Sequence, residues 1–237
     1  MTMTMPPLRA AIFDKDGTLV DFHATWDPAT GAGLRAAIAD EATLRAAAEA
    51  IGYDLETDTI RPDSIFIAET NDVIFAALEP HVDIEEFFEA CMVAANDCTT
   101  AADGLPDLLT SLRSRGVGLA VATNDWEQIA VDQLQILGWE DLFDAVLGSD
   151  SGHGAKPDPE MVLEAARRLG VEPAEAIMVG DTAHDLHAGR AAGMETVLVS
   201  GSGGTGAVTA ETEALADIVV TSLAELESIL VARGRLA

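Results

Sequence analysis

The sequence predicts an α/β fold, a Rossmann-like parallel sheet flanked by helices, with an inserted all-helical cap. Three observations support this prediction. An apolar run at 9–14 is typical of a buried strand and ends in a polar turn. The next stretch, 21–101, has helical spacing, and from residue 103 helical patterns alternate with short apolar runs. Helices that end in glycine and precede short apolar strands are typical of a parallel sheet with right-handed crossovers.

The strand at 9–14 is followed by the insert, in which no segment has a convincing strand pattern. Three segments have the apolar spacing and the Ala and Glu content of helices: 28–51, 63–78 and 83–96. Aspartates suited to cap these helices stand at or just before their starts: Asp27, Asp63 and Asp83. Pro28 fits the first turn of the first helix. We therefore predict a core domain, 1–20 and 102–237, that carries a helical cap domain, 21–101.

The second half of the chain supplies the rest of the predicted sheet. Short apolar strands are predicted at 118–122, 145–147, 176–179, 196–199 and 218–220. Helices are predicted at 105–115, 125–137, 159–169, 186–192 and 223–230. Open α/β folds bind ligands at the carboxyl ends of their parallel strands. We therefore look for a site among the polar residues that follow these strands, with the cap lying over them.

The composition excludes several classes of partner. Asp and Glu number 41 against 13 Lys and Arg, which gives a formal net charge of −28. Nucleic-acid binding depends on cations that neutralise phosphates, so a general nucleic-acid binder is excluded, and an anionic membrane surface is equally disfavoured. No apolar run approaches the roughly 18 residues of a membrane span, and we find no secretory signal. Cys91 and Cys98 have no zinc-ligand spacing. We expect a cytoplasmic monomer or homodimer.

Two carboxylates stand at the end of the first strand. Asp14 and Asp16 repel one another there, so the arrangement needs a cation, a shared proton or a substrate. The only lysines of the chain are Lys15, between them, and Lys156. In a chain that uses lysine so rarely, each lysine is a candidate for a site that needs a compact ammonium group.

Four motifs follow predicted strands in order: Asp14-Lys15-Asp16-Gly17-Thr18, Thr123-Asn124, Lys156-Pro157, and Gly180-Asp181-Thr182 with Asp185. Together they resemble the haloacid dehalogenase superfamily, particularly its phosphoglycolate phosphatase-like branch, and the resemblance covers essentially the whole chain. It implies a Mg²⁺-dependent phosphatase that hydrolyses a small phosphorylated metabolite, a phosphomonoester, through an aspartyl-phosphate intermediate.

The resemblance implies a role for each motif residue. Asp14 is the expected nucleophile, and Asp16 is the expected general acid and base. Gly17 allows the sharp turn and exposes backbone N–H groups to a phosphate. The Thr123 hydroxyl and the Asn124 backbone N–H are expected to donate to phosphoryl oxygens. Taken alone, Thr123 also fits a helix cap.

The remaining motif residues are expected to bind charge. Lys156 would set an ammonium group against both the phosphoryl group and Asp14. The side chains of Asp14 and Asp181 and the backbone carbonyl of Asp16 would supply hard oxygen ligands suited to Mg²⁺. In the family, the residue at the position of Asp185 does not bind the metal directly but supports the metal site and the lysine.

Other functions remain open. A phosphomutase of the same superfamily would keep all four motifs, and a protein of another class could bind a phosphorylated ligand without turnover. Asp16 argues against a haloacid dehalogenase, because a halide needs no protonation, and the lack of lysine in the cap excludes the phosphonatase route. The glycine-rich run 201–206 has dinucleotide-binding spacing, but no acidic residue ends the next strand, so we interpret it as a flexible loop.

Some residues near the motifs have two interpretations. Lys15 stands where many family members have a bulky apolar residue, which indicates altered packing or an extra phosphate contact. His23 and Trp26 either line the substrate mouth or pack at the cap hinge. For His153 and His184, a structural role is favoured over a site role.

Overall fold

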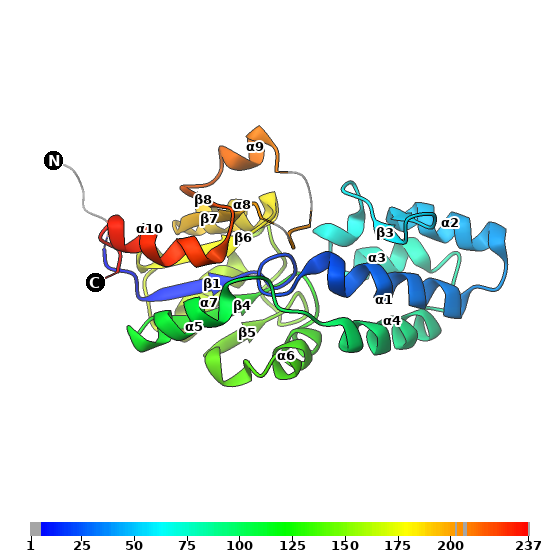
Figure 1. Cartoon of the computed structure of the whole chain (residues 1–237), viewed down its shortest axis with the longest axis horizontal. Helices are drawn as coiled ribbons and strands as arrows, with labels where there is room; N and C mark the ends of the chain where they lie inside the picture. Colours follow the sequence, from blue (N-terminus) through cyan, green and yellow to red (C-terminus); the bar gives the residue numbers. More distant parts are fainter. Residues whose placement is uncertain (1–5, 202, 206–207, 237) are drawn as a thin grey trace.

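The centre of the core is a six-stranded sheet in the order β5-β4-β1-β6-β7-β8, in which every pair is parallel (Figure 1). The structure, a computed structural model, describes residues 6–201, 203–205 and 208–236. The strands are β1 (Ala10–Phe13), β4 (Gly118–Ala122), β5 (Ala145–Leu147), β6 (Ala176–Gly180), β7 (Glu195–Val199) and β8 (Ile218–Val220). The predicted parallel sheet is therefore confirmed, with each strand end within a residue of its expected position.

Helices cover both faces of this sheet. Alternate residues of a strand point to opposite faces, so Ala11 and Phe13 enter one apolar cluster while Ala10 and Ile12 enter another. The first cluster is closed by α5 (Leu105–Ser114) and α10 (Leu226–Ala232), and the second by α7 (Glu160–Leu169) and α8 (Ala183–Ala192). The remaining core elements are α6 (Glu127–Ile136), α9 (Ala210–Glu213), η2 (Glu140–Leu142), η3 (Pro173–Glu175) and η4 (Leu223–Glu225). The last predicted helix, 223–230, is thus η4 followed by α10.

The insert between β1 and α5 lies at the right of Figure 1, beyond the ends of the strands. Its elements are α1 (Phe22–Ala37), α2 (Glu41–Ile51), β2 (Tyr53–Asp54), β3 (Thr59–Ile60), η1 (Ile65–Ile67), α3 (Asn71–Leu78) and α4 (Ile84–Cys98). Most members of its apolar cluster come from the insert itself, from Phe22 to Ala95. We call this part of the chain the cap, and the domain boundaries given above stay a prediction.

The prediction of an all-helical cap is wrong, because β2 and β3 form a small antiparallel hairpin with Tyr53 paired to Ile60. The turn is held by Asp54, whose Oδ1 accepts hydrogen bonds from the backbone N–H groups of Glu56 (2.8 Å) and Thr57 (3.2 Å). Each strand has only two residues, which is too short for an alternating pattern to appear in the sequence.

The first predicted cap helix, 28–51, is two helices. Asp21, not Asp27, caps α1, and its Oδ1 accepts from the N–H of Ala24 at 2.9 Å. Asp27 lies inside the helix and accepts from the N–H of Ile60 at 2.8 Å, which ties the hairpin to α1. The chain is extended at Ile38, and a new cap at Asp40 starts α2.

The second predicted cap helix, 63–78, is also divided. Ser64 precedes the single turn η1, and α3 begins only after the extended residue Thr70, so Asp63 is not a cap. The third prediction is confirmed, because Asp83 accepts from the N–H groups of Glu85 and Glu86 at the start of α4. Within the described residues, no helix has both the length and the apolar character needed to cross a membrane.

Candidate active site

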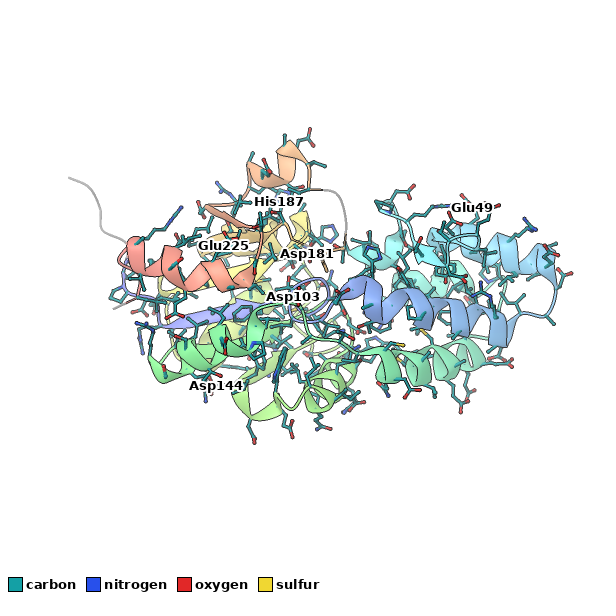
Figure 2. The ribbon with its side chains drawn as sticks, in the orientation of Figure 1. Glu49, Asp103, Asp144, Asp181, His187 and Glu225 are labelled. Atoms are coloured by element: carbon teal, nitrogen blue, oxygen red, sulfur yellow. The ribbon has the colours of Figure 1, made fainter. Side chains whose placement is uncertain are left out.

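Two of the predicted site aspartates follow neighbouring strands. Asp14 comes directly after β1 and Asp181 directly after β6, and Phe13 pairs with Val179 across these strands. The N–H of Asp14 continues the ladder by donating to the carbonyl of Val179 at 2.8 Å. Asp181 lies near the boundary between the core and the cap (Figure 2). The sheet therefore brings together two carboxylates that are far apart in the sequence.

Asp185 joins these two aspartates from the first turn of α8. One carboxylate oxygen from each of Asp14, Asp181 and Asp185 lies within 4.8 Å of the others. Asp185 is fully buried, and its Oδ2 accepts from the N–H (3.0 Å) and the hydroxyl (2.7 Å) of Thr182, which caps α8. Its carboxylate is thus fixed by the start of its own helix.

Lys156 supplies the positive charge of this cluster. Its Nζ donates to Asp14 Oδ1 at 2.5 Å and to Asp185 Oδ1 at 2.6 Å. Burial alone would lower the pKa of Lys156, but the charges of Asp14 and Asp185 raise it above its ordinary value. Lys156 is therefore a protonated ammonium group held between two carboxylates, as expected for a group that neutralises charge at a reaction centre.

The cluster still has more negative than positive charge. Burial, followed by the charge of Asp185, raises the pKa of Asp14 well above its ordinary value. The same two causes raise the pKa of Asp181 to about 7. Asp181 Oδ1 is a buried oxygen without a hydrogen-bond partner. An unpartnered oxygen among crowded carboxylates fits a hard divalent cation such as Mg²⁺, which takes oxygen ligands.

Thr205, which is not among the residues predicted from the sequence, also contacts this cluster. Its backbone N–H donates to Asp181 Oδ2 at 2.7 Å, and its hydroxyl donates to the same oxygen. Thr205 belongs to the glycine-rich run 201–206 that we interpreted as a flexible loop; Ser202 and Gly206 of that run lie outside the described residues. Nothing in the sequence distinguishes Thr205 from a threonine in an unstructured turn.

The second motif connects three parts of the molecule. Thr123 is buried after β4, and its Oγ1 accepts from the N–H of Asp125 at 3.1 Å. The N-cap of α6 is Trp126 and has no side-chain hydrogen bond, so the alternative interpretation of Thr123 as a helix cap is wrong. The Asn124 side chain bonds both backbone groups of Lys156 and donates to the carbonyl of Ala68 in the cap at 2.8 Å. Asn124 therefore positions the Lys156 loop through its side chain.

Gly17 has a backbone conformation that favours glycine, with φ of +79°. A Cβ at this position would lie 2.4 Å from Asp181 Oδ2, so only glycine lets the loop approach the aspartate. Its N–H donates to the carbonyl of Val20 at 2.8 Å. What the structure describes for Gly17 is thus a conformational role, and its contact with a phosphate stays a prediction.

The Lys15 side chain is fully buried and is surrounded by other side chains. Its Nζ donates to Asp16 Oδ1 (2.8 Å) and to Gln133 Oε1 (2.5 Å), and it forms an ion pair with Asp125 Oδ2 (3.0 Å). It also lies 5.2 Å from the centre of the Trp26 ring. Of the two interpretations of Lys15, altered packing is the one the structure supports.

We expect Lys15→Met to lower the free energy of unfolding by about 3–5 kcal/mol, because the buried Asp125 carboxylate would lose its cation. Adding Asp125→Asn should restore part of the loss. Urea denaturation measures both effects. Arg45→Met is the matched control, because Arg45 pairs with Glu41 in solvent, and its midpoint should stay close to that of the unchanged chain. A Lys15→Met protein as stable as this control would contradict the assignment.

A cavity between the cap and the strand ends contains most of the predicted site residues. It is lined on the core side by Asp14, Asp16, Thr123, Asn124, Lys156 and Thr182. Trp26 lines it from α1, and its Nε1 donates to Asp16 Oδ1 at 2.7 Å. His184 also lines it, with Nδ1 3.2 Å from the Ala68 carbonyl oxygen. His23 and His153 do not line the cavity; they pair with Asp27 and Glu164.

Comparison with known proteins places the chain in a family. A family model described as haloacid dehalogenase-like hydrolase matches residues 8–193, and a second, described as HAD-hydrolase-like, matches residues 153–235. A phosphoglycolate phosphatase of Psychrobacter arcticus is 37% identical over 114 residues, which are 48% of this chain and 50% of the relative. The match covers about half the length of this phosphoglycolate phosphatase and of those of Aquifex aeolicus and Chromobacterium violaceum.

Longer matches extend over both the core and the cap. An N-acetylmuramic acid 6-phosphate phosphatase of Pseudomonas aeruginosa is 29% identical over 205 residues, 81% of each chain. The crystal structure of a HAD family hydrolase from Deinococcus radiodurans, with bound phosphate and sodium, is 26% identical, covers 98% of both chains and superposes with a TM-score of 0.66. The first family match includes β1, the cap, β4 and β6 with the aspartates that follow β1 and β6, and on this basis the chain belongs to the haloacid dehalogenase-like hydrolase family.

Proposed function

We propose that this protein is a Mg²⁺-dependent phosphatase that hydrolyses a small phosphomonoester through an aspartyl-phosphate on Asp14. The observation that carries the proposal is the buried cluster in which Lys156 and Asp185 join Asp14 and Asp181, the two aspartates that follow neighbouring strands. An ammonium group that contacts the nucleophile neutralises charge where a phosphoryl group develops it. The names of the relatives support the reaction class but specify different esters, so they do not select the substrate.

In the proposed reaction, a carboxylate oxygen of Asp14 attacks phosphorus and the bond from phosphorus to the ester oxygen breaks. Asp16 gives its proton to the departing alkoxide. Asp16 then takes a proton from water as the water oxygen attacks the aspartyl-phosphate, which releases phosphate and restores Asp14. Trp26 and Lys15 hold the Asp16 carboxyl group in place through their hydrogen bonds. Thr123 and the backbone N–H of Asn124 are the proposed donors to the phosphoryl oxygens.

Asp14, Asp181 and the backbone carbonyl of Asp16 are the groups proposed to hold Mg²⁺. When bound, the ion would supply positive charge next to the phosphoryl oxygens. Thr205 and Gly17 would act on the site indirectly, because one bonds Asp181 and the other allows the loop to approach it. Asp185 would position Lys156 and keep its charge beside Asp14.

The test is release of inorganic phosphate from a broad panel of phosphate esters by the purified protein with Mg²⁺, and again with EDTA. We expect release that requires the metal. Absence of release from every ester would contradict the proposal. Interconversion of sugar phosphates without release of phosphate would instead identify a phosphomutase.

We expect Mg²⁺ binding to weaken at low pH, because a metal ligand must be deprotonated and the pKa of Asp181 is raised to about 7. Protons compete with the ion below that pKa, so the apparent Kd should rise about tenfold or more from pH 8 to pH 6. The apparent Kd is measured at each pH from the dependence of the thermal unfolding midpoint on Mg²⁺ concentration. Asp181→Asn should lose the Mg²⁺-dependent shift, whereas Glu211→Gln, in an exposed position, should keep it. A pH-independent Kd would contradict the ligand assignment.

A further inference from the structure

The cavity has a polar floor and an apolar roof. Its floor is formed by the core residues described above. Its roof comes from four elements of the cap, α1, η1, α3 and α4, and from the residues between η1 and α3. Most of its side chains are apolar, among them Phe22, Trp26, Phe66, Phe75, Phe88 and Met92. Phe66, Phe75, Phe88 and Met92 are only partly buried, although they border the apolar cluster of the cap. The part of an ester that lies beyond its phosphoryl group would therefore contact aromatic and aliphatic surface.

The roof offers no cation. Within residues 6–201, 203–205 and 208–236, Lys156 is the only Lys or Arg that lines the cavity, and it already contacts two carboxylates. The three cap arginines pair with acids elsewhere: Arg35 with Asp58, Arg45 with Glu41, and Arg61 with Glu49 and Asp63. Figure 2 shows Glu49 on the side of the cap that is remote from Asp181.

The start of α3, the cap helix whose first turn borders the cavity, does not compensate for this lack of positive charge. The first turn of α3 borders the cavity at Asn71, but Glu69 lines the cavity just before it and Asp72 lies within that turn. These acids oppose the partial positive charge of the helix start. The Asn71 side chain already donates to Asp125 at 2.7 Å. A carboxylate on the ester would therefore enter an acidic, apolar space in which no Arg or Lys of the cap pairs with it, which is costly.

We infer that the ester hydrolysed at this site has an uncharged, apolar or aromatic alcohol group, and that carboxylate-bearing esters such as phosphoglycolate are poor substrates. This inference rests on the proposed phosphatase activity and adds the substrate class to it. The core residues bind the phosphoryl group, and the cap selects the alcohol by apolar contact and by the absence of a counter-ion.

The experiment compares 4-carbamoylbenzyl phosphate with 4-carboxybenzyl phosphate, which have nearly the same size and differ in charge far from the reacting bond. Benzyl phosphate and phosphoglycolate complete the set. With saturating Mg²⁺ at pH 7.5, we expect kcat/KM for the carbamoyl ester to exceed that for the carboxy ester by about tenfold or more. Benzyl phosphate should likewise be preferred over phosphoglycolate.

A charge introduced into the roof provides the matched test. Met92→Arg should reduce the preference for the carbamoyl ester at least about fivefold, since it places a cation in the cavity. Val93→Arg, the next residue on α4, is 62% exposed and outside the cavity lining, so it should leave the preference unchanged. If the Met92 variant does not fold, the ratio of kcat/KM for the carbamoyl and carboxy esters in the unchanged enzyme still tests the inference.

The outcomes separate this inference from the function on which it rests. Equal or better hydrolysis of the carboxy ester or of phosphoglycolate would overturn the inference and leave the phosphatase proposal intact. Phosphate release from no ester at all would overturn both. A preference for the neutral esters that Met92→Arg reduces and Val93→Arg does not would establish the roof as the selecting surface.

Discussion

Asp14→Asn should lower kcat for phosphate release by at least about 10⁴-fold, because an amide cannot attack phosphorus. When catalytic residues act together, the loss of one costs nearly as much rate as the loss of all of them. The fold should persist. Asparagine has nearly the same shape and its amide oxygen can still accept from Lys156, whose Nζ is 2.5 Å from Asp14 Oδ1. Without metal, the variant should be no less stable than the unchanged chain. Burial and then the charge of Asp185 raise the pKa of Asp14, so the ionised Asp14 carboxylate is disfavoured in the folded protein and its removal relieves that cost. Steady-state kinetics and thermal unfolding in EDTA measure the two effects.

The control for this variant is Asp97→Asn, in an exposed position of α4, which should retain full activity. Mass spectrometry must exclude deamidation of the introduced asparagine, since reversion to Asp14 would mimic a dispensable nucleophile. A protein with intact Asn at this position and more than a tenth of the original kcat would eliminate Asp14 as nucleophile. The observed contacts among the clustered carboxylates do not depend on that assignment.

Lys156→Met should damage both stability and activity. Removing the ammonium group leaves buried Asp14 and Asp185 facing each other, which we expect to cost about 3–5 kcal/mol in the free energy of unfolding in EDTA. The activity with Mg²⁺ should fall by about 10²–10³-fold, the usual effect of removing one group that stabilises transition-state charge. Chemical denaturation measures the change in the free energy of unfolding, and phosphate-release kinetics measure the change in activity.

A second substitution separates the two effects of Lys156→Met. In the double variant Lys156→Met/Asp185→Asn, stability should recover in part because one unpaired carboxylate is gone, whereas activity should not recover. Arg168→Met is the matched control, since Arg168 pairs with Glu164 near the surface, and it should change both quantities little. If Lys156→Met unfolds like this control, Lys156 is not the charge that holds the cluster together.

The sequence by itself determined the sheet and the aspartates that stand at the ends of its strands. Glycine-ended helices and short apolar runs predict five strands of the second half within one residue, because buried strands and helix ends depend on local composition. The aspartate after β1 and the aspartate after β6 are likewise local features at strand ends. Their meeting follows from the parallel sheet, which aligns strand ends at one edge.

Only the tertiary structure decided the contacts between distant parts of the chain. Thr205 bonds an aspartate 24 residues away, and Lys15 bonds a glutamine 118 residues away, so neither contact leaves a periodic pattern in the sequence. The hairpin at Tyr53–Ile60 depends on two-residue strands, and the roof of the cavity depends on side chains from four cap elements. Local patterns record backbone propensity and burial, whereas the partners of a buried polar group and the charge of a cavity are set by packing in three dimensions.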